Sequence, residues 1–577
     1  MSFRARMRVA LVGAAVAALA APAAAWAHAA LLKTSPEASV VLNAPPDRVT
    51  LTYSEAVEPR FAIVSVTDAQ GHQQTVGRLQ RSSSNPDVLA VRLRRVPEGW
   101  YLVYWRVISV DGHPVRGAFT FAVGPNPGPA PQFVIPSISE TAATPALIAT
   151  RWIVFLSAML ATGLFFFRSV IARPMRQRVP QSRLRMVTFA FLASLAVALI
   201  STPVYLLMST AKFALRHSWE LGAIVPLVRD SAFGRGYVDF EVVLALFAIA
   251  ACVLLRVERQ EARQRPASEL VALVGALLAA GALFVIPGVA GHAAQTSPRG
   301  VTVGLDWLHL VTGSIWIGGL VGLIALFASL DGASRLAGLS VCVPRFSRLA
   351  FVSVLLLVGS GTGAAIIHLP TLASLWQTSY GKTIIVKVGL LGGAMLLASV
   401  NMLRNTPKLR AAQTRPAEAA GAAALLRGLV SGEVVLVAGA ILAAATLSSL
   451  PPPPKALASI GAISAHVGPG LVTMAVDHGA YRLAFRVDPN RAAVPNTFSV
   501  AITKGGQPVR HADVSATFTM LDMEMGQLAY QLPETAPGRY GRSAPALVMV
   551  GHWGLTFDVR PQGAAPFTVG LEDRANG

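Results

Sequence analysis

The chain has 577 residues, of which 53% are hydrophobic and only 14% are charged. Soluble domains usually carry about 25% charged residues, so this composition indicates a protein with a large membrane part. The net charge of +20 would favour a nucleic-acid partner in a soluble chain, and the two cysteines exclude a disulfide scaffold and a Cys-rich zinc site. No P-loop or redox motif occurs in the sequence, so we do not expect an enzyme.

Residues 1–27 read as a targeting segment. They begin with three arginines, continue through a short apolar run over 9–21 and end in Ala-Trp-Ala. This pattern is typical of a cleaved secretory signal peptide, and the apolar run is short for the alternative, a first transmembrane helix. Cleavage after Ala27 would make His28 the N-terminal residue of the mature chain.

Residues 28–125 contain several short runs of β-branched and aromatic residues, separated by turn signals such as Asn-Ala-Pro-Pro-Asp. Runs of this kind and spacing predict an antiparallel all-β sandwich. A linker rich in proline and glycine follows over 126–144.

Residues 145–450 hold eight apolar stretches, each close to the length of about 20 residues that spans a bilayer. We expect transmembrane helices at about 146–167, 186–208, 238–255, 268–288, 303–327, 349–368, 383–403 and 428–449. The sequence therefore predicts an eight-helix transmembrane bundle.

The charges between these stretches predict an orientation. If residues 28–145 are outside, eighteen Lys and Arg fall in the four inner connections and six in the three outer ones. Positive charge accumulates on the cytoplasmic side, so both ends of the mature chain are expected outside. Much of the net charge is then explained by topology, and a nucleic-acid partner is not expected. Both cysteines would be cytoplasmic, where a structural disulfide does not form.

Residues 451–577 return to strand-like runs after four consecutive prolines. They predict a second small all-β sandwich, on the same side of the membrane as the first. The expected fold class is therefore a multi-domain membrane protein, with an all-β sandwich, an eight-helix bundle and a second all-β sandwich.

The first candidate site joins His28 to the sequence Val-Asp-Gly-His-Pro, which contributes Asp111 and His113. An N-terminal histidine offers an amine and an imidazole, and a second imidazole with a carboxylate completes a square-planar set that suits Cu(II). Asp-Gly-His is also compatible with a plain turn and a surface histidine. The N-terminal histidine favours the metal site.

The segments around these residues resemble the CopC family of copper-binding sandwiches. They read HAALLKTSPEASVVLNAPPDRVTLTYSEAVE and WRVISVDGHPVRGAFTFAVG, and the resemblance covers residues 28–124. It implies His28, Asp111 and His113 as Cu(II) ligands in a periplasmic domain.

The second candidate site lies at the outer end of the bundle. It comprises His292, Asp306, His309 and His368. Asp306 and His309 are spaced i,i+3, so they share a helix face, and ionisable groups at membrane depth are costly and usually functional. Each histidine could instead be an interfacial residue bonded to a carbonyl. Lys387 and Glu433 lie within the last two stretches, where they could pair or gate the bundle.

The string DWLHLVTGSIWIGGL, together with TSYGKTIIVKVGLL and LRGLVSGEVVLVAGAILAAATLSSLPPPP, resembles the CopD family of copper-transport membrane proteins. The resemblance covers about 145–455. It implies copper movement into the cytoplasm, with His292, Asp306 and His309 as candidate ligands.

The third candidate site is the methionine cluster Met520, Met523 and Met525. Met523 and Met525 alternate along a strand and share a face, and thioethers suit Cu(I). The segment resembles a YtkA-like sandwich found after some CopD units. A methionine-rich core edge is an equally good interpretation.

The sequence thus predicts a bacterial plasma-membrane protein that captures copper outside and passes it inward. Cu(II) is expected in the outer sandwich, and the sites elsewhere are compatible with Cu(I). Other periplasmic copper-handling proteins are compatible partners. Two alternatives stay open. One is a b-type haem oxidoreductase with His309 and His368 as axial ligands, and the other is a module that sequesters copper and transports none.

Overall fold

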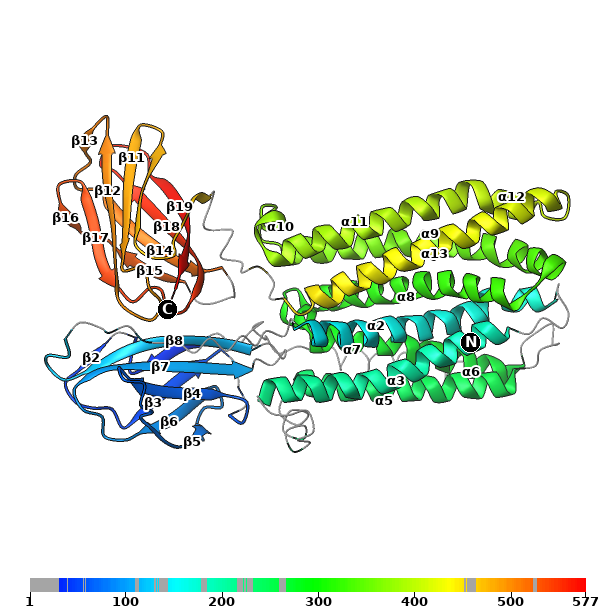
Figure 1. Cartoon of the computed structure of the whole chain (residues 1–577), viewed down its shortest axis with the longest axis horizontal. Helices are drawn as coiled ribbons and strands as arrows, with labels where there is room; N and C mark the ends of the chain where they lie inside the picture. Colours follow the sequence, from blue (N-terminus) through cyan, green and yellow to red (C-terminus); the bar gives the residue numbers. More distant parts are fainter. Residues whose placement is uncertain are drawn as a thin grey trace, which may run out of the picture.

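The computed structural model contains two β units and a helical bundle, in the chain order that the sequence predicts. It describes residues 31–38, 40–54, 57, 59–108, 114–128, 131, 133, 144–177, 184–214, 222, 225, 232–258, 266–450, 453, 463–521 and 527–576. The two β units lie next to each other at one end of the bundle (Figure 1). The segment 1–27 lies outside the described residues, so the signal peptide stays a prediction.

The first β unit is a sandwich whose described residues form two sheets, in strand orders β1-β3-β6-β5 and β2-β8-β7-β4. The strands are β1 (Leu31–Ser35), β2 (Val41–Leu42), β3 (Arg48–Tyr53), β4 (Ile63–Asp68), β5 (Thr75–Arg81), β6 (Val88–Leu93), β7 (Gly99–Ile108) and β8 (Pro114–Val123). Tyr53 and Trp105 meet edge to face in the core, with ring centroids 5.6 Å apart. Gly117 makes room for this pair, because a Cβ there would lie 2.6 Å from the Trp105 indole. The predicted sandwich is confirmed.

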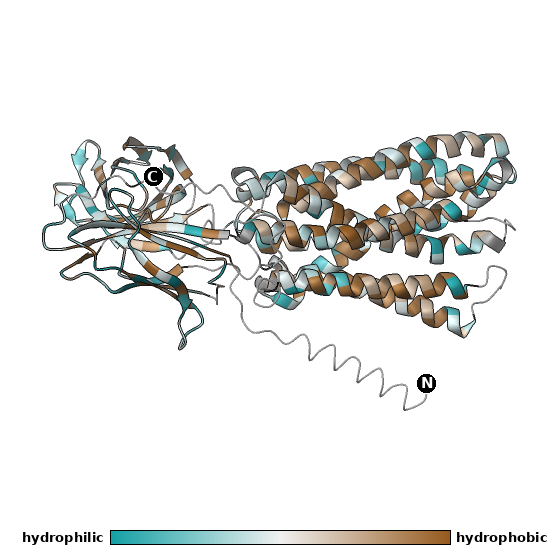
Figure 2. Cartoon of the chain, turned by 60° about the horizontal axis from the view of Figure 1, so that its bottom comes forward, coloured by the Kyte–Doolittle hydropathy of each residue, from teal (hydrophilic) through white to brown (hydrophobic). Residues whose placement is uncertain are grey.

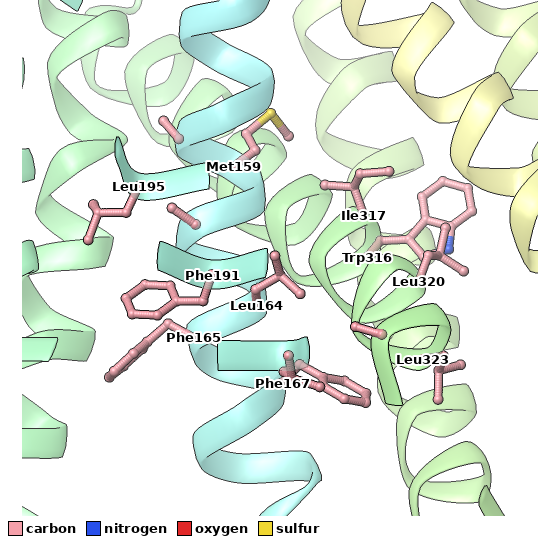
Figure 3. Packing of buried hydrophobic residues seen from close by; sticks show 14 of the residues in the cluster. Met159, Leu164, Phe165, Phe167, Phe191, Leu195, Trp316, Ile317, Leu320 and Leu323 are labelled. Atoms are coloured by element: carbon pink, nitrogen blue, oxygen red, sulfur yellow. The ribbon is translucent and has the colours of Figure 1, made fainter. Parts of the chain in front are cut away.

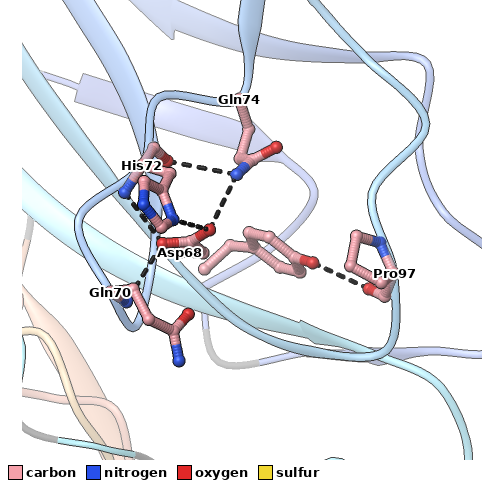
Figure 4. Close-up of polar contacts among 6 residues, drawn as sticks. Asp68, Gln70, His72, Gln74 and Pro97 are labelled. Carbon is pink, nitrogen blue, oxygen red and sulfur yellow. Dashed lines mark hydrogen bonds and ion pairs between the residues drawn. The ribbon is translucent and has the colours of Figure 1, made fainter.

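Asp68 organises the turn between β4 and β5 (Figure 4). Its Oδ1 accepts the backbone N–H groups of Gln70 and His72 at 3.0 and 2.8 Å, and its Oδ2 accepts the side-chain amide of Gln74 at 2.9 Å. Desolvation alone would raise the pKa of Asp68, but the bonds from the His72 and Gln70 backbone stabilise the carboxylate and lower its pKa below the ordinary value. The turn is thus fixed by its own residues.

Among the described residues, eight helices are long and apolar enough to span a bilayer, as predicted. The spans are Pro145–Met175, Arg185–Lys212, Phe233–Val257, Ala267–Ala290, Arg299–Ser329, Ser334–His368, Ser379–Arg410 and Pro416–Leu447. The helical elements of the bundle, including the short ones between the spans, are α2 (Pro145–Phe166), η1 (Phe167–Ile171), η2 (Arg173–Gln177), α3 (Arg185–Ala214), α5 (Ala232–Val257), α6 (Ala267–Leu283), α7 (Val285–Ala290), η4 (His292–Gln295), α8 (Arg299–Ser329), α9 (Gly332–His368), α10 (Ser374–Gln377), α11 (Ser379–Val400), η5 (Asn401–Asn405), α12 (Thr406–Arg410) and α13 (Pro416–Leu447). Hydrophobic residues dominate along these helices (Figure 2).

Two helices extend well beyond their apolar stretches. The sequence predicts connections over 328–348 and 404–427, but α9 begins at Gly332 and α13 at Pro416. The extensions bury Cys342 and Leu426 against the rest of the bundle. Hydropathy alone marks the part of a helix that lies in lipid, so it misses turns that pack against other helices.

Helices α2 and α8 pack closely through glycine. Figure 3 shows Leu164 and Ile317 between them, while Phe165 and Phe191 lie on the other side of α2 with tilted rings whose centroids are 5.7 Å apart. A Cβ at Gly318 would overlap the backbone of Gly163, so only glycine permits this approach. The contact fixes α8, which carries two of the predicted site residues, against the core of the bundle.

The bundle end that lies away from the β units is held by buried ion pairs. Arg168 Nη1 lies 2.8 Å from Glu258 Oε2, and Arg173 Nη1 lies 3.1 Å from Glu269 Oε1. Each joins α2 or its continuation to a neighbouring helix. Because a buried charge without a partner is costly, these pairs fix how the helices assemble at this end.

The second β unit is also a sandwich, as predicted. In the described residues its sheets have the strand orders β10-β11-β12-β17-β16, with β13 on β12, and β15-β14-β18-β19-β9. The strands are β9 (Ile463–Val467), β10 (Val472–His478), β11 (Tyr481–Asp488), β12 (Asn496–Lys504), β13 (Gln507–Pro508), β14 (Asp513–Met520), β15 (Leu528–Gln531), β16 (Glu534–Ala536), β17 (Arg539–Ala544), β18 (Gly551–Arg560) and β19 (Phe567–Ala575). Phe485 packs on Phe557 across the core, with ring centroids 4.7 Å apart.

The two β units contact each other along β8. The hydroxyl of Thr120 donates to the carbonyl of Ala493 at 2.8 Å, and the N–H of Ala118 donates to the carbonyl of Val548 at 3.3 Å. Ala118 and Ala493 also share a small apolar cluster with Tyr104. The first β unit therefore contacts the second, and its residues Phe61 and Ile108 also join the buried cluster of the bundle.

Candidate functional site

A large cavity of about 980 Å³ lies inside the bundle, in the half that faces the β units. We call it the outer cavity. Its walls come mainly from α2, α5, α8, α9, α11 and α13 and are mostly apolar. Among the described residues, the charged and titratable side chains that line this cavity are Arg151, Tyr237, Asp306, His309, His368, Tyr380 and Lys387. Three of the four residues predicted at this end of the bundle thus line one cavity.

His309 contacts a lysine from another helix. Its Nε2 lies 3.2 Å from the Nζ of Lys387 on α11, while its Nδ1 lies 3.1 Å from the carbonyl oxygen of Leu357 on α9. A carbonyl only accepts, so we assign the proton to Nδ1 and the lone pair to Nε2, which accepts from the ammonium. Lys387 therefore occupies the direction in which His309 would bind a metal.

Asp306 lies one turn before His309 on α8, and both line the outer cavity, as their i,i+3 spacing predicts. The charges of Asp306 and Lys387 attract each other across this cavity. His309 is ten residues beyond the start of α8, which is about 15 Å along the helix axis. The group thus lies at membrane depth, where a lysine without a nearby carboxylate would be strongly disfavoured.

His368 ends α9 at the mouth of the outer cavity. Its Nδ1 lies 2.8 Å from the carbonyl oxygen of Ala364, and its Nε2 lies 3.4 Å from the hydroxyl of Thr296. His292 begins the short helix η4, and its side chain lies outside the described part. Within that part, no group of three or more His, Cys, Asp or Glu side chains is close enough to hold a metal ion. A preformed site of that kind is therefore not seen there.

The other two candidate sites fall largely outside the described residues. This applies to His28, Asp111, His113, Met523 and Met525. Met520 is described, and it is 2% exposed in the core of the second β unit, opposite Trp553 on β18. Its position agrees with the interpretation of this cluster as a core edge.

Sequence reasoning missed the network around Arg151. This arginine on α2 is buried, and its Nε donates to the Tyr205 hydroxyl at 2.8 Å. Its Nη1 donates to the carbonyl of Ser448 and to the hydroxyl of Ser449, both at 2.8 Å. The only signal in the sequence is one arginine within an otherwise apolar stretch, which equally fits a residue that reaches the membrane surface.

The suggested pairing of Lys387 with Glu433 is wrong. Glu433 Oε1 accepts a hydrogen bond from Asn401 Nδ2 at 2.6 Å, whereas Lys387 contacts His309. Asn401 lies fourteen residues beyond Lys387 on the same continuous helix, about 21 Å along its axis. Because α13 runs antiparallel to α11, Glu433 lies level with Asn401 and far from Lys387.

Four family models match the chain. They are "CopC domain" over 31–124, "Copper resistance protein D-like, N-terminal domain" over 141–302, "Copper resistance protein D" over 341–447 and "YtkA-like" over 476–558. Their order agrees with the three predicted units. Asp306 and His309 fall between the second and third matches, so the matches themselves carry no support for these two residues.

The chain also resembles individual proteins. It is 24% identical over 547 residues to copper transport protein CutJ of Bacillus subtilis, which covers 93% of this chain and 95% of that protein. It is 35% identical over 99 residues to protein YobA of Escherichia coli, covering 17% of this chain and 80% of YobA. A crystal structure of CopC from Methylosinus trichosporium is 32% identical, covers 18% of this chain and 98% of its own, and has a TM-score of 0.16. The four matches, together with the eight helices that are long and apolar enough to span a membrane, show a multi-pass membrane protein with a CopC-like unit, a CopD-like unit and a YtkA-like unit in this order.

Proposed function

We propose that the protein binds copper on the side of the membrane that carries the β units and passes it through the bundle into the cytoplasm. The matches to CopC and CopD families and the likeness to a copper transport protein support this function. The observation that carries the route is the meeting of Asp306, His309 and Lys387 on the outer cavity.

The β units are assigned to the periplasmic side. Eight spans bring both ends of the bundle's chain to one side, and the two β units lie together at that end (Figure 1). The opposite end contains most of the basic residues between the spans. This charge distribution supports a cytoplasmic location for that end.

Capture is assigned to His28, Asp111 and His113 in the first β unit, with copper as Cu(II). The match of residues 31–124 to the CopC domain supports a copper site in this unit. The N-terminal amine and imidazole of His28 supply two ligands only after the signal peptide is cleaved. Capture therefore depends on export and processing of the chain.

Entry into the bundle is assigned to an exchange between copper and Lys387. Without copper, the ammonium donates to His309 Nε2 and is attracted by Asp306. When copper takes the Nε2 lone pair, charge repulsion moves Lys387 away from His309, and the nearby carboxylate stabilises the ammonium in its new position. The Lys387 ammonium thus balances the charge of Asp306 when the cavity holds no copper. This pairing limits the cost of desolvating the charged groups both with and without copper.

The haem alternative uses the same cavity. His309 and His368 lie on neighbouring helices and both line the cavity, but the Nε2 of His309 accepts from Lys387. Axial ligation by His309 would require Lys387 to leave. A Soret band on the purified protein would favour haem, and a copper content without such a band favours the proposal.

Cellular copper content tests the function directly. Cells that express the protein should retain more copper after a wash with an impermeant chelator than cells without it, and a cytoplasmic copper reporter should respond. Copper that the wash removes, with a silent reporter, would support sequestration at the surface and contradict transport.

A further inference from the structure

A second, smaller cavity lies in the half of the bundle away from the β units. Its volume is about 160 Å³, and residues of α8, α9, α11, η5 and α13 line it. On α13 its lining runs from Leu426 to Glu433, whereas that of the outer cavity runs from Val437 to Leu447. We call it the inner cavity. The two cavities follow one another along the bundle axis.

Trp316 and Met395 line both cavities. Trp316 is 1% exposed, and it stands on α8 seven residues beyond His309, on the same stripe of the helix. The two side chains therefore form a partition between the outer and the inner cavity. An ion that moves directly from one cavity to the other would therefore meet an indole and a thioether.

The inner cavity contains an acidic group at membrane depth. Glu433 is 1% exposed, and its Oε1 accepts from Asn401 Nδ2 at 2.6 Å. Asn401 Oδ1 in turn accepts from Asn405 Nδ2 at 2.8 Å. This chain of amides orients the carboxylate, and a carboxylate held in an apolar bundle is a costly feature that usually serves ions or protons.

The other donors at this cavity are soft. Met395 and Met402 both line it, and thioether sulfur is a ligand that selects Cu(I). Residues Asn401–Asn405 form a π-helical turn, a rare local structure that occurs often at functional sites. One element thus brings an amide and a methionine to the same wall of the cavity.

The charges of the two cavities differ. Arg151 and Lys387 line the outer cavity along with Asp306, whereas none of the described residues that line the inner cavity is basic. The single negative charge of Glu433 would balance one Cu(I) ion. A divalent ion would leave one positive charge unbalanced in apolar surroundings, which is unfavourable.

We infer that the inner cavity is a second copper site, in which the Glu433 carboxylate and the thioethers of Met395 and Met402 hold Cu(I) after it passes Trp316. Copper enters the bundle already as Cu(I), after a one-electron donor outside the membrane, such as a thiol, has reduced the captured Cu(II). This inference rests on the proposed transport function and assigns the cytoplasmic half of its route. Copper would then move through the bundle in two steps, between sites on either side of one partition.

The test is Glu433→Gln in the full-length protein. Glutamine keeps the oxygen that accepts from Asn401 and removes only the charge. Glu241→Gln is the matched control, because Glu241 is also a carboxylate within a membrane span but is not among the residues that line either cavity. The measurements are bound copper per chain after dialysis against a Cu(I) chelator, and Cu(I) uptake into proteoliposomes.

Glu433→Gln should retain one copper ion fewer per chain than the wild type and take up copper at least tenfold more slowly. Glu241→Gln should match the wild type in both measurements. Met395→Leu, a change of similar volume, should weaken Cu(I) retention even if Glu433→Gln folds poorly. Wild-type retention by both Glu433→Gln and Met395→Leu would overturn the inner site. If the wild-type protein takes up no copper, the transport function is overturned instead. The number of copper ions bound per chain would then still show whether the inner site exists.

Discussion

The Nζ of Lys387 lies 3.2 Å from the Nε2 of His309, although the two residues stand on different helices, 78 positions apart in the chain. This contact makes the lysine a competitor for the lone pair that a copper ion would use. Asp306 supplies the negative charge near both. In the proposed membrane site, a side-chain cation therefore holds the position that a metal ion would have to take.

Replacing this competitor should strengthen copper binding. Lys387→Met leaves His309 Nε2 free and Asp306 without its counter-charge, so the affinity of the outer cavity for copper should rise by about tenfold, or 1.4 kcal/mol. Competition with a chelator on the purified protein measures this change. Lys382→Met, at an exposed position on the same helix, should bind copper as the wild type does. Weaker binding by Lys387→Met would mean that the lysine supports the site.

The capture site depends on a free N-terminus. One residue added before mature His28 displaces the amine from the chelate, so Cu(II) affinity should fall more than tenfold. The ligands must also lose protons before they bind, so affinity should fall as the pH becomes acidic. Isothermal titration of the full-length protein measures both effects, and a residue added after Gly577 serves as the control. Equal affinity with and without the N-terminal extension would contradict the site.

The orientation can be read from reporter fusions. Fusions after Arg178 and Arg410 should be active as cytoplasmic reporters, because both positions fall in the basic connections of the sequence. Fusions after Gly300 and Pro454 should be active only as periplasmic reporters. A cytoplasmic reporter signal after Pro454 would reverse the assigned side of the second β unit.

The second β unit should respond to pH through Asp573. This residue is fully buried, and its Oδ2 has no hydrogen-bond partner among the residues that the structure describes. Burial raises the pKa of Asp573 to about 6, against about 3.9 in an unfolded chain. Between these values the folded state holds a proton that the unfolded state has released, so stability is lost as the pH rises through this window.

Asp573→Asn should remove this loss, which is about 3 kcal/mol over the whole window and about 2 kcal/mol between pH 4.5 and pH 7.5. Asparagine keeps an oxygen that accepts from Asn490, so the local contacts persist. Thermal unfolding of the second β unit at pH 4.5 and pH 7.5 checks the prediction. The wild type should be less stable at pH 7.5 relative to the variant, and an equal pH dependence in both proteins would contradict it.

Much of the architecture follows from local patterns. Apolar length predicts the eight spans, strand-like runs predict both sandwiches, and the i,i+3 spacing predicts that Asp306 and His309 face one cavity. These are properties of single segments, which the sequence displays directly. The starts of α9 and α13 differ from the predicted starts because Cys342 and Leu426 are buried by neighbouring helices and not by lipid.

The partners of the charged groups could not be predicted in this way. Lys387 contacts His309 and Glu433 contacts Asn401. Both contacts follow from how α8, α11 and α13 pack and from the position of each residue along the bundle axis. The network of Arg151 likewise joins α2 to residues nearly 300 positions later. Such contacts depend on the assembled bundle, and charge alone suggested the wrong pair.

Copper uptake per molecule by His309→Ala tests the account most directly. Wild-type and variant proteins are reconstituted in proteoliposomes at equal measured amounts, with Cu(II) binding by the first β unit and thermal stability as controls. We expect the variant to insert normally, to keep its outer Cu(II) site and to show uptake at the level of empty liposomes. Uptake that falls only in proportion to reduced protein level or stability would indicate a structural role for His309, and full uptake per molecule would contradict a route through this residue.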